Sequence, residues 1–578
     1  MFGLKNSPIE NQRPLKVVII GAGFSGIYTT IRITQRLRNI DLTVYDMNEE
    51  VSGVWWLNRY PGLACDIPSY SYQFSFAPNP YWSSLYAPGP EIRAYMQDVA
   101  QRYGAMRYIK VSHKVEAATW NTGDRKWHMT VLDLKTGRQF EDVADILISA
   151  RGGLNQIFWP KIIGLDSFRG KLMHSGAWDE SKGSRSHSYD ARNKKIGIIG
   201  NGSSAIQIVP SLQSLEGTNL WCFARSPTWI SRAFGDSAMQ KLGMDPMDTQ
   251  FSRRHQEYLA RHPEKFHLIR KTLEEEAAKI YPITLQETEQ STQARHMFEE
   301  DMRRRLGQSK ELAELIIPKF APGCRRLTPG PRYLEALQQD NVHFINTGIK
   351  RITPDGIEMV SGEHIELDTI VCATGYDVEA APLFELTGRD GVTLSEKIKP
   401  YSQSYLGVAM DKFPNFLLIG GPNSGLGSGS LISVFEAQGD YAVKMLRKIQ
   451  KEDYATFEVK TDRVADFSQY IDEYFKKTVY TDECSSWYRA GRSGSRIVAL
   501  WPGSSNHCLE ALRSPRWEDF LWESADSTGN LLRWLGNGWS LTLTEGDPAW
   551  FLDEDVVDEP CEERPETSEF YRRRPFSH

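Results

Sequence analysis

The sequence predicts an α/β protein with two Rossmann-like dinucleotide-binding domains and an inserted helical region. Glycine-rich turns stand at Gly21-Ala22-Gly23-Phe24-Ser25-Gly26 and at Gly200-Asn201-Gly202-Ser203-Ser204-Ala205. Each turn follows a continuous apolar run, typical of a buried parallel strand, and precedes a helical pattern. Between positions 233 and 319 the composition changes to charged, helix-forming residues, which we interpret as an insertion with a solvated face.

Length and charge set limits on the possible classes of protein. At 578 residues the chain is longer than one hydrophobic core supports, so several domains are expected. A formal net charge of -6 gives no reason to expect a nucleic-acid partner. The N-terminus lacks an apolar signal core, and no apolar run is long enough for a membrane span. We therefore expect a cytoplasmic protein.

The cysteines predict no special sulfur chemistry. The chain has seven, an odd number, widely scattered and never spaced as CxxC. This pattern argues against a disulfide framework, a zinc site or a dithiol redox centre. The expectation is therefore no metal and chemically silent thiols.

The first glycine turn is part of a complete strand-turn-helix-strand pattern. An apolar strand is expected at 16–20, a helix at 27–38, and a second strand at 42–45 that ends at Asp46. Glycines permit a tight turn and close approach to a pyrophosphate, the helix N-terminus attracts the phosphate charge, and an acid at this place binds ribose hydroxyls. The first unit should therefore bind a nucleotide.

A dense aromatic stretch, 53–66, follows the second strand. It contains Val54, Trp55, a proline-glycine turn and Asp66, and the aromatic character continues to Tyr72. Such a composition excludes a regular helix and favours a structured loop that folds over the bound nucleotide. A surface loop with a hydrophobic anchor is the alternative interpretation.

The second unit differs from the first at the end of its second strand. Strand 220–224 ends in Arg225-Ser226, whereas the corresponding strand of the first unit ends in Asp46. A carboxylate accepts ribose hydroxyl protons and repels a 2′-phosphate, whereas an arginine attracts one. This contrast predicts FAD in the first unit and NADPH in the second.

Tandem arginines follow the insertion, at Arg325 and Arg326. Adjacent residues of an extended chain point to opposite sides, so one could clamp a cofactor phosphate while the other faces the chemistry. An exposed basic pair is at least as consistent with the sequence alone. Two later strands, 369–372 and 416–419, are expected to complete the first domain.

These patterns give the following predicted organisation. The FAD domain occupies 1–150 and returns at 346–480; the NADP domain occupies 151–232 and returns at 320–345; the helical insertion covers 233–319; and 481–578 forms an aromatic cover segment with an acidic tail, expected to be disordered from 553 to 566.

The stretch between the two glycine turns carries a family resemblance. Phe168, Gly170, His174, Trp178 and Asp179 form the pattern FxGxxxHxxxW followed by Asp. Together with the paired glycine turns, this pattern resembles the Baeyer–Villiger monooxygenases among the class B flavoprotein monooxygenases. The loop 53–66 and the stretch 373–376 are similar to further motifs of that family, and the resemblance extends from about residue 16 to 520.

The resemblance implies an activity and a set of site residues. NADPH would reduce FAD, and O2 would then insert one oxygen atom beside a ketone carbonyl to give an ester or lactone. It places Arg326 beside the flavin, where it stabilises negative charge, with Asp66 nearby. The implied cofactor-binding residues are Gly21, Gly23, Phe24, Ser25, Gly26, Asp46, Val54, Trp55, Asp66, Ile67, Tyr72, Val115, Gly200, Gly202, Ser203, Ser204, Ala205, Arg225, Ser226, Arg325, His174 and Trp178.

His174 and Trp178 are expected to position NADP and couple the motion of the domains rather than to exchange protons with substrate. The overall pattern is similar to fungal members that act in secondary metabolism, which suggests a bulky ketone as the small-molecule partner. We expect a monomer or a weak homo-oligomer.

Two other classes stay open. A flavin-dependent N- or S-oxygenase would share the cofactor residues and differ mainly in the substrate cavity. A non-catalytic dinucleotide-binding sensor would keep the glycines but need neither Arg326 nor the linker pattern. Arg325, where the family commonly has lysine, makes the preference for NADPH over NADH less secure, and Arg151 has no sequence-based explanation.

Overall fold

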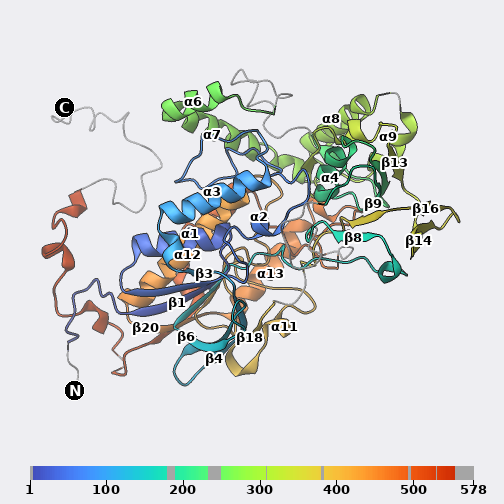
Figure 1. Cartoon of the computed structure of the whole chain (residues 1–578). Coiled ribbons are helices and arrows are strands. Elements are labelled where there is room, and N and C mark those ends of the chain that lie inside the picture. The colour runs from blue at the N-terminus through green and yellow to red at the C-terminus, as the bar shows by residue number, and fades with distance from the viewer. Residues whose placement is uncertain are drawn as a thin grey trace, which may run out of the picture.

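Two parallel sheets with their helices form the body of the molecule. The computed structural model describes residues 4–178, 189–231, 249–307, 309–378, 383–491, 496–528 and 530–552. Figure 1 shows the first sheet with its helices in the centre and the second sheet to the right, with α6 and α7 extending above them. Asp179, Cys561 and the predicted tail 553–566 lie outside the described residues.

The first sheet has five parallel strands in the order β19-β7-β1-β2-β3. Its strands are almost entirely buried apolar runs, as expected where helices or other layers cover both faces. The predicted strands 16–20, 42–45 and 416–419 are all found here, and β7 returns beside β1 as expected. The strands are β1 (Leu15–Ile20), β2 (Ile40–Tyr45), β3 (Ile109–Lys110), β7 (Ile146–Ser149) and β19 (Phe416–Leu418).

The second sheet also has five parallel strands, in the order β13-β10-β9-β17-β8. The strands are β8 (Lys171–His174), β9 (Lys195–Ile199), β10 (Asn219–Phe223), β13 (Val342–Ile345) and β17 (Thr369–Cys372). The assignment of 369–372 to the first domain is wrong, because β17 pairs with both β8 and β9. Periodicity identified this strand correctly, but a short apolar strand carries no information about which of two similar sheets it joins.

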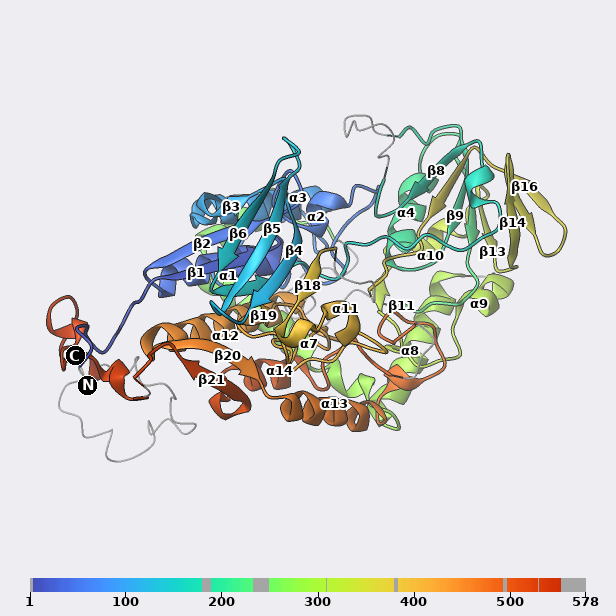
Figure 2. The same cartoon turned by 90° about the horizontal axis from the view of Figure 1, so that it is seen from below.

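Smaller sheets complete the two units. An antiparallel ribbon of β4 to β6, with β18 beside it, packs against the first sheet through a shared core (Figure 2). A three-stranded antiparallel sheet, β14 to β16, packs against the second sheet. Their strands are β4 (His113–Asn121), β5 (Lys126–Asp133), β6 (Gln139–Ala144), β11 (Ile230–Ser231), β12 (Thr328–Pro329), β14 (Ile349–Thr353), β15 (Gly356–Met359), β16 (His364–Glu366), β18 (Glu385–Thr387), β20 (Tyr454–Val459) and β21 (Phe520–Ser524).

The described part of the predicted insertion is helical, formed by α6 to α9. No described helix is long and apolar enough to cross a membrane, and the described residues contain no cluster suited to a metal ion. The helices are α1 (Phe24–Arg36), α2 (Val54–Leu57), α3 (Gly89–Arg102), α4 (Ser203–Gln213), α6 (Arg253–Arg261), α7 (Pro263–Ala278), α8 (Glu289–Arg305), α9 (Lys310–Ile316), α10 (Tyr333–Ala336), α11 (Leu394–Lys397), α12 (Leu431–Lys451), α13 (Thr461–Phe475) and α14 (Ser505–Leu512).

Helix α12 holds α1 against the first sheet. Gly439 of α12 lies directly against the ring of Tyr28 on α1, and the Tyr28 hydroxyl donates a hydrogen bond to Asp440 at 3.0 Å. The absence of a side chain at position 439 lets the two helices approach closely. Because α1 begins at the first glycine turn, this contact also fixes the turn's position.

We predict that Gly439→Ala destabilises the first unit. The added methyl carbon would lie 2.6 Å from the Tyr28 ring. Such overpacking should lower the free energy of unfolding by about 1–2 kcal/mol, net of the better helix propensity of alanine. Urea unfolding followed by circular dichroism measures the change. Gly153→Ala is the control, since its Cβ would meet no atom within 4 Å; equal midpoints for the two variants would contradict the prediction.

Candidate functional site between the two nucleotide units

The first glycine turn leaves the start of α1 open. Gly21 has a φ of +105°, and a Cβ on Gly26 would lie 1.9 Å from the Gly21 carbonyl oxygen, so both positions require glycine. Gly23 caps α1 without any side-chain hydrogen bond. The Gly21 and Ala22 N–H groups donate to the Tyr45 carbonyl and to Asp46. The N–H groups at the start of α1 remain available to an anion, and the geometry fits a pyrophosphate.

Asp46 stands at the end of β2, as predicted, and is only 5% exposed. Its carboxylate accepts hydrogen bonds from the backbone N–H groups of Ala22 at 2.7 Å and Asn48 at 2.8 Å. Burial raises the pKa of Asp46, although these hydrogen bonds oppose the shift. The acid thus holds the glycine turn in place, and its remaining lone pairs suit ribose hydroxyls.

The predicted Val115 is buried in β4. This strand begins beside Asp46, where the His113 backbone N–H donates to the Asp46 carbonyl.

Aromatic side chains cover the first turn. Trp55 of the short helix α2 donates through Nε1 to the Tyr72 hydroxyl at 3.2 Å, and Tyr72 packs edge-on against Phe24 with ring centroids 5.4 Å apart. Val54 and Ile67 lie in the same segment, and Ser25 donates to the Ala150 carbonyl at 3.4 Å. The predicted loop over the nucleotide is thus a packed layer rather than a free surface loop.

The second glycine turn repeats the geometry of the first. Gly200 has a φ of +119°, and Gly202 caps α4 without a side-chain hydrogen bond. A Cβ at Gly202 would meet nothing within 4 Å, so the space before α4 is open. Ser203 hydrogen-bonds Thr328 at 2.6 Å, and Ala205 is buried in the core of this unit. This cradle also fits a pyrophosphate.

Arg225 and Ser226 follow β10 and lie beside the second turn. The Asn201 side-chain amide donates a hydrogen bond to the Ser226 carbonyl, which fixes this loop next to the start of α4. Arg225 itself is exposed. An exposed guanidinium at this place, where the first unit has a buried carboxylate, is available to a 2′-phosphate.

The loop 53–66 connects the two units. Tyr60 donates a hydrogen bond from its hydroxyl to the Gln207 side chain of α4 at 2.9 Å, and Gln207 in turn donates to the Ala64 carbonyl at 2.9 Å. The Tyr60 hydroxyl also lies near Ser204. Gly62 packs so closely on α4 that a Cβ would lie 2.4 Å from the Gln207 carbonyl oxygen. The layer over the first turn is therefore anchored at the start of the second helix.

Arg326 and Asp66 form a two-pronged ion pair across this junction. Nε and Nη2 of Arg326 donate to the two Asp66 oxygens at 2.8 and 2.7 Å. Burial opposes the charge on Arg326, but the carboxylate of Asp66 and the neighbouring Tyr488 outweigh it, so the pKa of Arg326 is raised. The guanidinium is thus a permanent, fixed cation between the two turns.

Arg325 has a different environment. Among the described residues it forms no hydrogen bond or ion pair with a carboxylate, and burial lowers its pKa. Its neighbour Arg326 is paired with Asp66, so the two adjacent arginines have different surroundings. A half-buried cation without a carboxylate suits an anionic ligand group.

A third arginine, Arg151, lies beside Gly21 just after the end of β7. Burial lowers the pKa of Arg151 as well.

His174 is buried in a hydrogen-bond network between the linker and the stretch 373–376. Its Nδ1 accepts the Gly176 N–H at 3.0 Å, while Nε2 lies 3.3 Å from the Thr374 hydroxyl, which itself donates to the Phe158 carbonyl. This arrangement requires a neutral ring with its proton on Nε2. Burial lowers the pKa of His174 to about 4. Above that pH His174 is a structural group that holds three chain segments together.

The linker also reaches the loop over the first turn. Gly176 packs against Tyr376, whose hydroxyl donates to the Asn58 side chain at 2.7 Å. Trp178 is half-buried and lies edge-on to Tyr189, with ring centroids 6.3 Å apart. The linker therefore contacts, through Tyr376, the loop that covers the first turn. Asn58, Tyr376 and Tyr488 were not predicted as site residues; the aromatic segment around Tyr488 was visible in the sequence, but its contact with Arg326 was not.

The fold and this junction define an oxidoreductase-type architecture with two dinucleotide units that share an arginine. Residues 19–88 match the family model of an NAD(P)-binding Rossmann-like domain. An FAD-binding monooxygenase, tazF, of Aspergillus terreus is 36% identical over 95% of this chain and 96% of that protein. A Baeyer-Villiger monooxygenase of Pseudomonas aeruginosa is 30% identical over 85% of this chain and 88% of that protein.

Solved structures show the same fold. Cyclohexanone monooxygenase from Rhodococcus sp. Phi1, bound to NADP+, superposes with a TM-score of 0.74 at 22% identity, covering 89% of this chain and all of that one. OTEMO in complex with FAD and NADP gives a TM-score of 0.74 at 23% identity over 88% of this chain and 99% of that one. The chain belongs to the Baeyer–Villiger monooxygenase family of flavin-dependent enzymes. The resemblance seen in the motifs is thereby confirmed.

The His174 network predicts a loss of stability on acidification. The folded-state pKa of about 4 lies below the ordinary value of 6.5, so the folded state resists protonation. The stabilisation from a neutral His174 is fully present above pH 6.5 and is lost as the pH falls toward 4. Between pH 7 and pH 5 this one group should cost about 2 kcal/mol of unfolding free energy.

Urea unfolding at the two pH values measures this loss. His174→Asn keeps a hydrogen-bond acceptor but does not titrate, so it should lose about 2 kcal/mol less than the wild type on acidification. The exposed His267→Asn should behave as the wild type. If His174→Asn and the wild type show the same pH dependence, His174 is not the neutral buried group described above.

Proposed function

We propose that this protein is an FAD-dependent, NADPH-consuming monooxygenase that inserts one oxygen atom of O2 beside a ketone carbonyl to give an ester or lactone. The observation that carries the proposal is the fixed Arg326–Asp66 pair between two open glycine turns. Membership of the Baeyer–Villiger family and the FAD and NADP named for its structural relatives support it. The substrate we propose is a bulky ketone of secondary metabolism, in keeping with the fungal FAD-binding monooxygenases among the relatives.

The two cofactors are assigned to the units by charge. FAD would occupy the first turn, with its pyrophosphate at the start of α1 and its ribose on Asp46. NADPH would occupy the second turn, with its 2′-phosphate between Arg225 and Arg325, two cations that the described residues leave without a carboxylate partner. The flavin, once reduced by NADPH, supplies the activation of O2.

The chain's own contribution is electrostatic and positional. Arg326 presents a permanent positive charge where negative charge develops during oxygen transfer, and Asp66 fixes its orientation through two hydrogen bonds. Charges fixed before the reaction need no reorganisation during it, which is the largest source of rate enhancement in many enzymes. The aromatic layer of Trp55 and Tyr72 excludes water from the same region. His174 and Trp178 position the second nucleotide and couple the units rather than transferring protons.

A flavin N- or S-oxygenase shares this machinery, and a sensor would need only the glycine turns. The fixed cation Arg326 favours the oxygenase over the sensor, because a sensor needs only the glycine turns, whereas oxygen transfer develops negative charge that a fixed cation stabilises. We propose further that the protein is cytoplasmic and a monomer or weak homo-oligomer.

Arg326→Ala tests the catalytic assignment. Flavin reduction by NADPH without oxygen should change by about threefold or less, while ester formation should fall about 100-fold or more, because a fixed cation that acts only during oxygen transfer is lost. Stopped-flow absorbance and product analysis with a ketone panel measure the two steps. Arg326→Lys keeps the positive charge but loses the forked guanidinium, so its rate of ester formation should lie between those of the wild type and Arg326→Ala. If flavin reduction falls by the same factor as ester formation, Arg326 does not act specifically in the oxygen-transfer step.

Arg225→Ala tests the NADPH assignment. Removing a charge-assisted contact with the 2′-phosphate should raise the KM for NADPH about tenfold or more and leave that for NADH within about twofold. Steady-state oxidation of each nucleotide measures both values. Arg192→Ala, an exposed arginine of the same unit paired with Asp190, serves as the control. Equal effects on NADPH and NADH would show that Arg225 does not contact the 2′-phosphate.

A further inference from the structure

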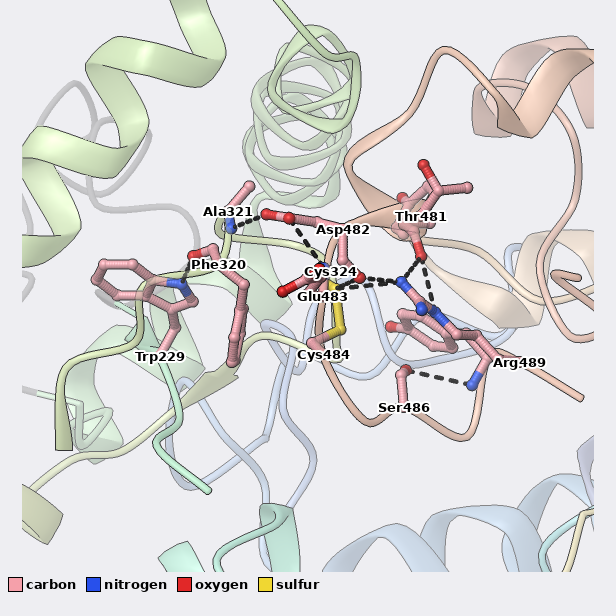
Figure 3. The surroundings of a disulfide bond; sticks show 12 residues. Trp229, Phe320, Ala321, Cys324, Thr481, Asp482, Glu483, Cys484, Ser486 and Arg489 are labelled. Carbon is pink, nitrogen blue, oxygen red and sulfur yellow. Dashed lines mark hydrogen bonds between the residues drawn. A yellow bond between two sulfur atoms is a disulfide. The ribbon is translucent and has the colours of Figure 1, made fainter. Parts of the chain in front are cut away.

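A disulfide bond lies beside the site arginines. Cys324 and Cys484, 160 residues apart, are linked with a Cα–Cα distance of 6.4 Å (Figure 3). The expectation of silent sulfur is therefore wrong. Cysteine spacing could not reveal the bond, because its partners lie in different parts of the chain and meet only in the folded protein.

Hydrogen bonds reinforce the link. The Asp482 carboxylate accepts the Ala321 N–H at 2.7 Å, on the segment that leads to Cys324. Arg489 donates through Nη2 to the Tyr480 carbonyl at 2.6 Å and also to the Asp482 carbonyl, and the same nitrogen lies 3.7 Å from Cys324 Sγ (Figure 3). The disulfide and these hydrogen bonds therefore hold the segments 480–489 and 321–324 together.

The link between these two segments places Tyr488 beside Arg326. Arg326 follows Cys324 by two residues, and Tyr488 follows Cys484 by four. The Tyr488 side chain lies beside the Arg326 guanidinium, and each group contributes to the pKa shift of the other. The Tyr488 ring is 2% exposed and packs edge-on against Tyr480 at 5.8 Å, and its carbonyl accepts the Val498 N–H at 2.9 Å. Tyr488 is thus held rigidly against a cation that Asp66 holds from the other unit.

We propose that Tyr488 is a positioning residue for Arg326, and that the Cys324–Cys484 bond keeps the C-terminal segment where Tyr488 can act. The inference rests on the function proposed above, since it assigns a second partner to Arg326. Asp66 fixes two nitrogens of the guanidinium; Tyr488 limits rotation of the pair as a whole. A cation misplaced by about 1 Å loses much of its effect on developing charge.

The bond also gives this position a redox dependence. A dithiol reductant supplies two electrons and two protons, becomes a disulfide itself and leaves thiols at Cys324 and Cys484. An oxidised dithiol re-forms the bond by exchange, with the reduced dithiol as the leaving group. Burial raises the pKa of the other described cysteines, Cys65, Cys222, Cys372 and Cys508, to about 12, so they stay unreactive thiols.

Tyr488→Phe in the FAD-loaded enzyme tests the positioning role. The measured quantities are ester formed and hydrogen peroxide released per NADPH consumed, together with the anaerobic rate of flavin reduction. We expect the ester yield per NADPH to fall about fivefold or more, with peroxide making up the difference, and flavin reduction to stay within about twofold. Tyr441→Phe is the matched control, because the buried Tyr441 hydroxyl has no hydrogen-bond partner among the described residues. If both variants keep the wild-type yield, Tyr488 does not position Arg326.

Reduction of the Cys324–Cys484 bond tests whether the bond holds the C-terminal segment in place, here called the clamp. The readouts do not depend on activity. Mass spectrometry after alkylation should find Cys324 and Cys484 linked in the untreated enzyme and free after treatment with a dithiol. Hydrogen exchange at 484–489 should then rise about tenfold or more. An untreated enzyme with both thiols free would overturn the clamp.

The two tests combine into a cycle. Reduction should lower the ester yield of the wild type as Tyr488→Phe does, and should change the yield of Tyr488→Phe by less than about 1.5-fold, because the two changes remove one shared interaction. Cys484→Ser should reproduce the reduced wild type without any reductant. If reduction lowers the yield equally in wild type and Tyr488→Phe, the bond does not act through Tyr488. Failure of the wild type to form any ester, with flavin reduction intact, would instead contradict the proposed function.

Discussion

The ion pair between Arg326 and Asp66 is the constraint around which this structure is arranged. A buried guanidinium is costly unless a carboxylate meets it with good geometry, and Asp66 does so with two hydrogen bonds below 3 Å. Because Asp66 belongs to the loop over the first glycine turn and Arg326 to the return segment after the insertion, the pair holds the two units at a fixed separation.

The two nucleotide units share one backbone arrangement but carry side chains of opposite charge at the end of the second strand. Both have a glycine with a large positive φ at the end of a central strand and an uncapped helix start. They differ where the second strand ends, with buried Asp46 in one and exposed Arg225 in the other. The anion-binding part is thus common to both, and in the proposed function this one side chain would distinguish a free ribose from a phosphorylated one.

The sequence predicts those features that depend on neighbours along the chain. Strand, turn and helix around Gly21 and around Gly200 were found as expected, because hydrophobic period and glycine placement are local signals. Contacts between distant segments were not predictable in the same way: β17 joined the second sheet, and Cys324 bonded to Cys484. The adjacency of Arg325 and Arg326 indicated two different partners, but only the fold shows that Asp66 and Tyr488 surround Arg326.

This difference separates cofactor binding from the control of reactivity. The pyrophosphate part of each cradle is a strand, a glycine turn and a helix that follow one another directly in the chain. The orientation of Arg326 depends on three stretches that meet only in the folded protein: the loop at Asp66, the return segment, and the C-terminal segment at Tyr488. Relatives with the same glycine turns can therefore bind the same nucleotides and yet differ in how tightly the arginine is held. Efficiency of oxygen transfer should accordingly vary with the C-terminal segment, which packs on the site without forming part of either nucleotide sheet.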